Sequence, residues 1–470
     1  MTINPEMNNK GIIQEQIGQI LNAGSIAVVG TSRQDDSPSN LAIKALKSSL
    51  KSHIYPVNPN VGEILGLKAY PDLQTIPENI DIVYISVSSG HIIDTLKDCV
   101  QKGVKGIIIN SAGFNELGTE KGLFLKAEVK RRVEGSGIRI IGPNCLGFYR
   151  PGINMIPIDT GEVPELSDDI KREGPVSLIS QSGWFCGFFM YQCMLRGGRF
   201  STVISSGNEI DIDFIDLMEY LGKDPATSVI SVYMEGIRDA VRFKKVASEI
   251  VPQKPILILK GGRTRGGASS AMSHTGSLTG DFEIFVGLCR QIGAQVVFSE
   301  RELINKTVTF ALCPVPKGNR VAILSGVGGA AVKAVDECSK HGLKVPEFSE
   351  STRKRLEKLL PSFASSRNPV DLTMMVMIHL DMFWESIKII ESSGEVDSII
   401  LHTGGNQYEE SLAPVLSDCQ LPLLVVSPPY WTKTIINGPL AKVGIPTFCH
   451  AEDAVSSLAA LVQYRRQCSD

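Results

Sequence analysis

His274 lies in a stretch whose composition favours chemistry over packing. The stretch, SSAMSHTGSLTGD at residues 269–281, surrounds the ring with serines, threonines and glycines. A neutral imidazole nitrogen can attack phosphorus and form a phosphohistidine, which divides one difficult transfer into two easier ones. A metal ligand would need a second His, Cys or carboxylate at fixed spacing, and none is present, so no metal site is expected. The alternative, for this stretch alone, is an ordinary histidine of a surface loop.

Glu235 is the candidate partner of that histidine. A nucleophilic imidazole needs a carboxylate on its other nitrogen, which fixes the tautomer and supports the charge. The segment SVYMEGIRD, residues 231–239, places Glu235 at the end of an apolar strand in the same expected domain. A carboxylate there is costly unless it is partnered. A solvated strand end is the alternative, and the combination with His274 favours the functional interpretation.

Two further segments predict helix N-termini that receive an anion. LISQSGWFCGFFM (178–190) and AILSGVGGAAVKAVDEC (322–338) each run from a strand through a Ser/Gly turn into a helix. Free N–H groups at a helix start, together with the helix dipole, attract phosphate. The first segment is not a nucleophile elbow, because Leu178 stands where G-x-S-x-G needs glycine. The residues expected to contact phosphate are Ser182, Gly183, Gly328 and Gly329.

A comparable turn occurs near the start of the chain, in AVVGTSRQDDSPSNLAIKAL at residues 27–46. Gly30 ends the strand, and the helix that follows can receive a phosphate-bearing ligand. G-x-G-x-x-G is missing, and no acidic residue ends the next strand, YPVNPN at 55–60, so dinucleotide binding is disfavoured. IIGPNCLGF, residues 140–148, could fix a ligand-binding loop at the edge of the same sheet. A plain structural turn is the alternative for both segments.

Alternating apolar and amphipathic segments predict three blocks of parallel α/β structure. Between residues 24 and 148, short Val- and Ile-rich runs alternate with segments of helical spacing at 40–50, 92–103 and 122–137. A second block has strand-like runs at 175–180, 200–207, 227–235, 254–262 and 294–300, and a third at 320–326, 398–405, 421–429 and 444–451.

We therefore expect an α/β protein with three Rossmann-like or flavodoxin-like doubly wound parallel-sheet domains in series. Stretches rich in Pro and Gly at 150–174 and 312–319 serve as boundaries. The length of 470 residues agrees with a prior of about 150 residues per domain. The expected domains are residues 1–150, 151–311 and 312–470.

The bulk composition limits the classes of partner and location. A formal net charge of −3 shows no basic field, so nucleic acid is not an expected partner. No apolar run is long enough to span a membrane, and the polar start lacks the regions of a signal peptide. Ten cysteines without CxxC pairs indicate reduced thiols, so a cytoplasmic protein is expected.

Taken together, the motifs resemble those of the NDP-forming acyl-CoA synthetases, in particular the α subunit of ADP-forming acetate–CoA ligase. That family is related to succinyl-CoA synthetase α. The resemblance covers about residues 20–470, in the order CoA-binding domain, ligase domain and second ligase-like domain. The motifs that carry it are VVGTSR, YPVNPN, SAGFNELG, IGPNCLGF, SLISQSG, SSGNEIDIDFIDLMEYLGKDP, YMEGIRD, SHTGSLTG and RNPVDL.

The resemblance implies roles for residues already singled out. His274 would be the phosphorylated histidine and Glu235 its orienting carboxylate. The turns at Ser182–Gly183 and Gly328–Gly329 would begin paired helices that point at the phosphate. The residues implied to hold CoA, with Asn144 bordering the acyl–CoA reaction centre, are Gly30, Ser32, Arg33, Asn58, Pro59 and Asn144.

The implied reaction is a reversible relay of one phosphoryl group. Acyl-CoA and phosphate give an acyl phosphate and free CoA, His274 takes the phosphoryl group, and ADP receives it to make ATP. The implied cofactors are CoA, phosphate and ADP/ATP with Mg. No ATP-grasp region is recognised, so the nucleotide and Mg are expected on a separate ATP-grasp β subunit. The expected assembly is an α/β hetero-oligomer acting on a small carboxylic acid or its acyl-CoA.

The sequence departs from the family pattern at two places, and two alternative functions are compared with the catalytic one. Asn40 stands where the family commonly has Gly, and the turn SGVGG lacks an Asn that relatives usually carry after the strand. A non-catalytic CoA- or acyl-CoA-binding regulatory protein of the same fold is one alternative, disfavoured because a sensor needs neither His274 nor Glu235. A nicotinamide-dependent oxidoreductase is the other, disfavoured by the missing glycines and acidic residue.

A cysteine, an aromatic run and a basic run are each expected to have a structural role. Cys145 is expected to be a small buried filler, because no histidine is nearby in sequence to activate it. The aromatic run that begins at Trp184 is expected in a core or subunit interface, with Trp184 at an acyl pocket as the alternative. The basic run KGGRTRGG, residues 260–267, is expected to be a solvated loop, with phosphate contact as its alternative.

Overall fold

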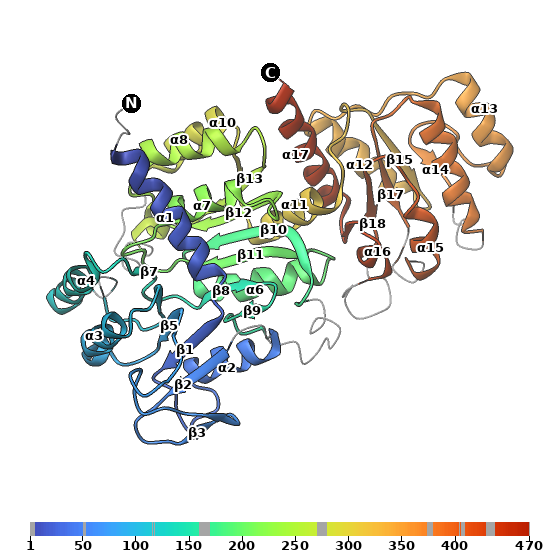
Figure 1. Cartoon of the computed structure of the whole chain (residues 1–470). Helices are drawn as coiled ribbons and strands as arrows, with labels where there is room; N and C mark the ends of the chain where they lie inside the picture. The colour runs from blue at the N-terminus through green and yellow to red at the C-terminus, as the bar shows by residue number, and fades with distance from the viewer. Residues whose placement is uncertain are drawn as a thin grey trace. The chain divides into compact units, whose positions relative to one another are not determined.

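The computed structural model describes most of the chain as two compact units (Figure 1). The described residues are 5–49, 53–114, 116, 118–158, 170–269, 280–373, 379–403, 405, 409–428 and 438–469. One unit comprises residues 1–191 with 199–297, and the other comprises 192–198 with 298–470. The first unit holds two sheets of parallel character and the second unit holds one.

The first sheet has five strands, all parallel. Its spatial order is β2 (His53–Val57), β1 (Ser25–Val29), β5 (Ile82–Ile85), β6 (Gly106–Ile109) and β7 (Arg139–Ile141). The first strand therefore lies inside the sheet, the second on one side of it and the later strands on the other. A short antiparallel pair, β3 (Glu63–Ile64) with β4 (Leu67–Lys68), lies outside this sheet.

The second and third sheets repeat this order. The second runs β14 (Gln295–Val297), β13 (Ile256–Lys260), β12 (Val229–Met234), β10 (Glu173–Ser180) and β11 (Phe200–Ser205), and continues into the antiparallel strands β8 (Gly147–Arg150) and β9 (Ile153–Asn154). The third runs β16 (Val370–Asp371), β15 (Val321–Ser325), β17 (Ser398–His402), β18 (Leu423–Val426) and β19 (Thr447–Phe448), all parallel.

Each sheet therefore has the flavodoxin-like order 2-1-3-4-5, whose direction of winding reverses between the first and third strands. These pairs are β1 with β5, β10 with β12, and β15 with β17. Open α/β sheets bind ligands in the crevice at the carboxyl ends of such a pair. The expected α/β class with parallel sheets is confirmed, and the topology predicts one ligand-binding edge in each sheet.

The helices cover the sheets and are mostly started by side-chain caps. Thr119, Asp213 and Ser299 each accept a backbone N–H at the start of the helix that follows. Within the described ranges, no helix is both long and apolar enough to cross a membrane. The helices are α1 (Pro5–Leu21), α2 (Pro38–Ser49), α3 (Ile92–Lys102), α4 (Glu120–Val133), α6 (Gly183–Met194), α7 (Phe214–Lys223), α8 (Ala240–Ile250), α10 (Phe282–Ile292), α11 (Glu300–Leu312), α12 (Gly328–Lys340), α13 (Glu350–Leu359), α14 (Asp381–Ser393), α15 (Glu409–Leu416), α16 (Pro439–Lys442) and α17 (Ala451–Ser469).

The core of the second unit shows why its sheet is doubly wound. Along β15, Val321 and Ile323 belong to one apolar cluster, with residues of α12 and α17. Ala322 and Leu324 belong to the other, with residues of α13 and α14. Because successive side chains of a strand point to opposite faces, a continuous apolar run buries both faces of the sheet.

The expected strands are confirmed in all three blocks, and the structure adds some that the sequence analysis missed. β8 and β9 fall partly within the stretch assigned to a boundary, yet they pair with the second sheet through β11. β16 is only two residues long, too short for a periodic pattern to indicate it. The domain limits at residues 150 and 311 stay a prediction.

Asn368 provides a test of how the third sheet is held. Its side chain, 8% exposed, accepts from Ile323 N at 3.0 Å and donates to Val321 O at 2.9 Å and Pro346 O at 3.0 Å. We expect Asn368→Ala to leave these buried backbone groups unsatisfied, at a cost of about 2–3 kcal/mol. The calorimetric transition of the second unit should fall by about 5–10 °C.

Asn319→Ala is the matched control, because this exposed amide donates one hydrogen bond, to Gly342 O at 2.9 Å. Its transition should fall by no more than about 3 °C. Equal shifts for the two variants would contradict the assignment of Asn368 as a substitute for a strand partner.

Candidate functional site

The turns after β10 and β15 are braced by a buried serine in the same way. Ser180 Oγ donates to Ser182 O at 2.7 Å and accepts from Ser182 N at 3.1 Å. Ser325 Oγ donates to Val327 O at 2.8 Å and accepts from Val327 N at 3.0 Å. Both serines are fully buried. Their hydroxyls fix the turns. The backbone N–H groups at the start of the following helices are then the groups available to a ligand.

The two helix starts differ in how they are capped. Ser182 Oγ accepts from Phe185 N at 3.4 Å at the start of α6, so this hydroxyl covers one N–H of the first turn. A Cβ on Gly183 would lie 2.9 Å from Leu146 Cγ, which explains why glycine begins this helix. In α12, Val327 makes no side-chain cap, and Gly328 and Gly329 are exposed. The first N–H groups of α12 therefore lie open to an anion.

Glu235 follows β12 directly and is buried, with 9% of its surface exposed. The Tyr233 hydroxyl donates to Glu235 Oε1 at 3.4 Å, and Lys260 Nζ donates to Glu235 O at 3.2 Å. Burial lowers the pKa of Lys260, and the nearby Glu235 opposes that shift. The alternative of a solvated strand end is therefore wrong, while the catalytic role of Glu235 stays a prediction.

Lys260 also corrects an expectation. The basic run at 260–267 was expected to be a solvated loop, but Lys260 is the last residue of β13 and is 2% exposed. Its ammonium also donates to Gly261 O at 3.1 Å. The expectation was wrong because a lysine at a strand end can bury its aliphatic chain when backbone carbonyls accept hydrogen bonds from its ammonium group.

Gln181 connects the ends of β10 and β12. Its Oε1 accepts from Glu235 N at 2.7 Å and from Gly236 N at 3.3 Å. Its Nε2 donates to Glu209 Oε1 at 3.1 Å and to Gly236 O at 3.4 Å. Because β10 and β12 are the pair at which the winding reverses, this amide spans the crevice of the second sheet.

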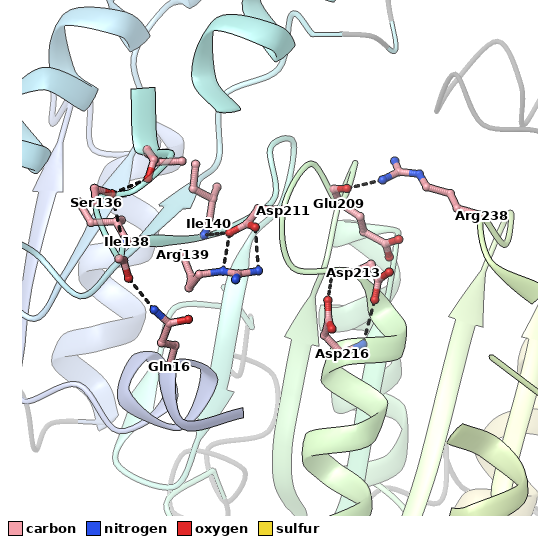
Figure 2. Close-up of polar contacts among 12 residues, drawn as sticks. Gln16, Ser136, Ile138, Arg139, Ile140, Glu209, Asp211, Asp213, Asp216 and Arg238 are labelled. Atoms are coloured by element: carbon pink, nitrogen blue, oxygen red, sulfur yellow. Dashed lines mark hydrogen bonds and ion pairs between the residues drawn. The ribbon is translucent and has the colours of Figure 1, made fainter. Parts of the chain in front are cut away.

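Glu209 lies in the turn after β11, with φ of 53° and 3% of its surface exposed. Burial raises the pKa of this carboxyl to about 7, although hydrogen bonds from Ser206 and Gln181 act in the opposite direction. Arg238 reaches the same turn and donates to the backbone carbonyls of Asn208, at 2.6 Å, and of Glu209. Figure 2 shows Arg238 pointing at the Glu209 turn from the segment after β12.

The Glu209 turn is also tied to the first sheet. Asn208 Nδ2 donates to Glu116 Oε2 at 2.6 Å, and Glu116 Oε1 accepts from Gly113 N and Phe114 N. Nearby, Arg139 pairs with Asp211, with 2.8 Å between its Nη2 and Asp211 Oδ1 (Figure 2). The Asn208–Glu116 contact therefore joins the carboxyl edge of the first sheet to that of the sheet carrying Glu235, while Arg139, the first residue of β7, makes its contact at the other end of that strand.

Gly30 directly follows β1 and lies in a cradle that only glycine fits. Its φ is 90°, and a Cβ there would lie 2.2 Å from Ser86 O, at the end of β5. Since β1 and β5 are the reversal pair of the first sheet, Gly30 lines that crevice. Asn58 Nδ2 donates to Thr31 O at 2.5 Å, so the loop after β2 closes against the Gly30 turn.

Asn40 holds the rest of this loop. It is 1% exposed, and its Nδ2 donates to Ser32 O at 2.7 Å and to Gln34 O at 2.9 Å, while its Oδ1 accepts from Ser32 N at 3.3 Å. The departure from glycine at this position therefore adds an internal clamp. The exposed Arg33 donates to Asn60 O at 3.4 Å, so it also reaches the loop that holds Asn58 and Pro59.

Asn144 lies where the segment after β7 turns, with φ of 56°, and its N donates to Ser111 O at 3.1 Å. The next residue, Cys145, is 2% exposed, and burial raises its thiol pKa to about 12. The interpretation of Cys145 as a buried filler is confirmed. Ser86 Oγ donates to Asn110, which donates to Cys145 O at 2.8 Å, so side chains link this turn to the end of β5.

The aromatic run divides between core and surface. Phe185 and Phe189 are buried, whereas Trp184 is 68% exposed and stacks on Phe188 with 5.0 Å between ring centroids. Trp184 and Phe188 line an apolar cavity of about 450 Å³. Leu146, which contacts the start of α6 at Gly183, forms another wall of that cavity.

The structure thus groups the expected residues at the carboxyl edges of their sheets. Gly30, Ser32, Arg33, Asn58 and Pro59 form one loop cluster, and Ser182, Gly183 and Glu235 follow the reversal strands of the second sheet. Gly328 and Gly329 begin α12 after the corresponding strand of the third sheet. His274 lies outside the described residues. Within the described ranges, no group of three or more His, Cys, Asp or Glu could hold a metal ion.

Two side chains that shape this site, Gln181 and Glu209, were not predicted from the sequence. Both lie in motifs already quoted, Gln181 in SLISQSG and Glu209 in SSGNEIDID. A polar residue at the end of an apolar strand was the available signal. Gln181 lies 28 residues from Glu209 and 54 residues from Glu235, so spacing alone could not identify these contacts.

Family models match two parts of the chain. Residues 24–151 match a CoA binding domain, and residues 173–310 match a succinyl-CoA ligase like flavodoxin domain. These matches cover the first and second sheets with the loops described above.

Several characterised proteins resemble the chain over most of its length. The α subunit of acetate–CoA ligase [ADP-forming] II from Pyrococcus furiosus is 34% identical to this chain. The alignment covers 94% of this chain and 96% of the length of that subunit. The 4-hydroxybutyrate–CoA ligase [ADP-forming] from Nitrosopumilus maritimus is 31% identical over 95% of this chain and 64% of its own length. Acetate–CoA ligase [ADP-forming] II from Archaeoglobus fulgidus is 35% identical, and this chain spans 56% of its length.

A solved structure agrees with the sequence relatives. The dinucleotide forming acetyl-coenzyme A synthetase 1 of Ca. Korarchaeum cryptofilum, in complex with phosphate and ADP, matches with a TM-score of 0.82 and 29% identity, over 96% of this chain and 97% of that one. The agreement therefore extends over all three sheets. The chain belongs to the family of ADP-forming acyl-CoA synthetases that includes the α subunits of acetate–CoA ligase.

Proposed function

We propose that this chain is the α chain of an ADP-forming acyl-CoA synthetase that works through a phosphohistidine at His274. The observation that carries the proposal is the position of Glu235. It is a buried carboxylate at the reversal pair of the second sheet, where β10 leads into the helix start at Ser182 and Gly183. A carboxylate held there suits a histidine that must stay in one tautomer while it takes and gives a phosphoryl group.

The reaction divides into three balanced displacements. A phosphate oxygen attacks the thioester carbonyl of acyl-CoA, the C–S bond breaks, and the CoA thiolate leaves and takes a proton. The imidazole nitrogen of His274 then attacks phosphorus, and the P–O bond to the acyl group breaks to release the carboxylate. A terminal oxygen of ADP attacks the phosphohistidine, the N–P bond breaks and ATP forms. A helix start such as that of α6, in the same unit as Glu235, would stabilise the dianionic group during transfer.

CoA is proposed to occupy the crevice of the first sheet. The Gly30 cradle lets a ligand approach the backbone closely, and the start of α2 follows it. Arg33 and the Asn58–Pro59 loop lie beside this turn, and Asn144 borders the reaction centre. The match of residues 24–151 to a CoA binding domain supports this placement.

The partner is proposed to be an ATP-grasp β subunit that binds ADP or ATP with Mg. The relatives named as α subunits support a separate partner chain. All ten cysteines are free thiols, which supports the proposal of a cytoplasmic enzyme. The family membership favours this catalytic role over the alternative of a regulatory CoA-binding protein.

His274→Asn is expected to lower ligase turnover by at least about 10³-fold, because the covalent carrier is lost. Glu235→Gln should lower it by about 10–100-fold, because the ring loses its orienting charge. The measurement is transfer of labelled phosphate to protein in the presence of acetyl-CoA, scored as an acid-labile, base-stable label. His450→Asn, an exposed histidine, is the control and should keep the label. Full turnover in His274→Asn would refute the phosphohistidine.

Asn40→Ala tests the CoA loop. The change removes three hydrogen bonds from the Ser32–Gln34 segment, so the loop must be ordered when CoA binds. We expect the Kd for CoA, measured by calorimetry, to rise about 10-fold, with phosphorylation of His274 from ATP unchanged in the complex with the partner chain. Ser48→Ala, an exposed residue of α2, should leave the Kd unchanged. An unaltered Kd for Asn40→Ala would place CoA elsewhere.

Trp184→Ala tests whether the apolar cavity receives the acyl group. An aromatic ring next to the start of α6 can cover a bulky apolar acyl group but adds little for acetate. The ratio of kcat/KM for phenylacetate to that for acetate should therefore fall about 10-fold. Phe124→Ala removes a comparably exposed ring on α4 and should leave the ratio unchanged. An equal loss for both acids would instead indicate a subunit contact at Trp184.

A further inference from the structure

We propose that Gln181 is a positioning residue for the phosphoryl relay. Its side chain connects the turn that contains Glu235 to the buried carboxyl of Glu209 and so fixes that turn in place. This inference rests on the proposed function, because it assigns a partner to the carboxylate that orients His274. Gln181 itself touches no reacting atom in this account. It acts through the backbone of Glu235 and Gly236.

Gln181 lies directly after β10, where its side chain contacts the turn that follows β12. Its backbone N donates to Tyr233 O at 3.1 Å, extending the pairing of β10 and β12 by one residue beyond the strand ends. At that point the following helices leave toward opposite faces, so no further ladder bonds can hold the two turns together. The side chain supplies the missing connection across the crevice.

Every hydrogen-bonding position of the Gln181 amide is used. Its oxygen accepts two backbone N–H groups, from Glu235 at 2.7 Å and Gly236 at 3.3 Å. Its nitrogen donates to Glu209 Oε1 at 3.1 Å and to Gly236 O at 3.4 Å. Two donors and two acceptor sites are all that an amide has, and only this orientation of oxygen and nitrogen satisfies the neighbours.

Glu209 is suited to be the fixed end of this connection. Ser206 Oγ donates to its Oε1 at 2.7 Å, and Arg238 holds its backbone and that of Asn208. The charged groups that act on its carboxyl are Arg238, after β12, and Asp213, at the start of α7. The side chain of Asn208 is in turn bonded to Glu116 of the first sheet. Because the Glu209 turn is held by Ser206, Arg238 and Glu116, it can keep the neighbouring Glu235 turn in a fixed position.

The first test removes the connection. In Gln181→Met, a side chain of similar length leaves the N–H groups of Glu235 and Gly236 without their acceptor. Phosphorylation of His274 from acetyl-CoA and labelled phosphate should slow by about 10–100-fold, because small misplacements of an orienting group are costly. The Kd for CoA should not change. Gln14→Met is the matched control, since Gln14 also donates to a backbone carbonyl, Asp216 O at 3.3 Å, and it should phosphorylate at the wild-type rate.

The second test exchanges the two partners. Gln181→Glu keeps an acceptor for the Glu235 turn but faces a second carboxyl, so the pair holds together only while it shares a proton. Its phosphorylation rate should therefore fall as the pH rises from 6 to 8 by about 10-fold more than that of the wild type. Adding Glu209→Gln restores a donor opposite an acceptor. The double variant should recover at least about 10-fold over Gln181→Glu at pH 8.

The outcomes separate this proposal from the one on which it rests. If the wild-type chain forms no phosphohistidine, the proposed function fails and the role of Gln181 in the relay is overturned with it. If the wild type is phosphorylated but Gln181→Met is phosphorylated at the same rate, Gln181 positions nothing that matters to the relay. If the double variant is no faster than Gln181→Glu at pH 8, the bond to Glu209 is not the one that holds the turn. A parallel rise in the Kd for CoA would indicate general unfolding of the edge instead of positioning, and would also overturn the inference.

Discussion

The reversal of winding between the first and third strands of each sheet is the constraint on which the site depends. Helices that follow such a pair leave on opposite faces, so the carboxyl ends of the two strands are the one edge that no helix covers. β1 with β5, β10 with β12, and β15 with β17 each form this pair. Gly30, Gln181 and Gly326 follow the first member of their pair, and the helix starts lie just beyond them.

Backbone groups at such an edge leave the ladder while still partly buried, and side-chain amides take over as their partners. Asn40 does so in the Gly30 loop and Gln181 at the Glu235 turn. Asn368 plays the same part away from this edge, beside the first half of β15. An amide suits this task because it donates and accepts at one place and carries no charge to be desolvated. The acidic and basic side chains of the same edge belong to Glu235 and Lys260, and both residues are held through backbone atoms.

Much of the fold could be predicted from the sequence, because long periodic segments report burial on one or both faces. The continuous apolar runs of β10 and β15 correctly indicated parallel strands. β8, β9 and β16 could not be identified in this way, since strands of two to four residues carry no period. Of the site, Glu235 was predicted because a carboxylate after an apolar strand is unusual. The tie from Gln181 to Glu209 depends on how β10 and β11 are placed, and Lys260 was misjudged because glycines and arginines follow it.

The matching serine braces after β10 and β15 have a consequence for how fast the enzyme can work. Because Ser180 and Ser325 shape their turns entirely from within the chain, these turns are already in place before any anion arrives. Such preorganisation spares the ordering entropy that a flexible loop would lose on binding. Capture of phosphate at these turns would then be limited by diffusion and access, and differences in affinity would be expressed mainly in how quickly the anion escapes.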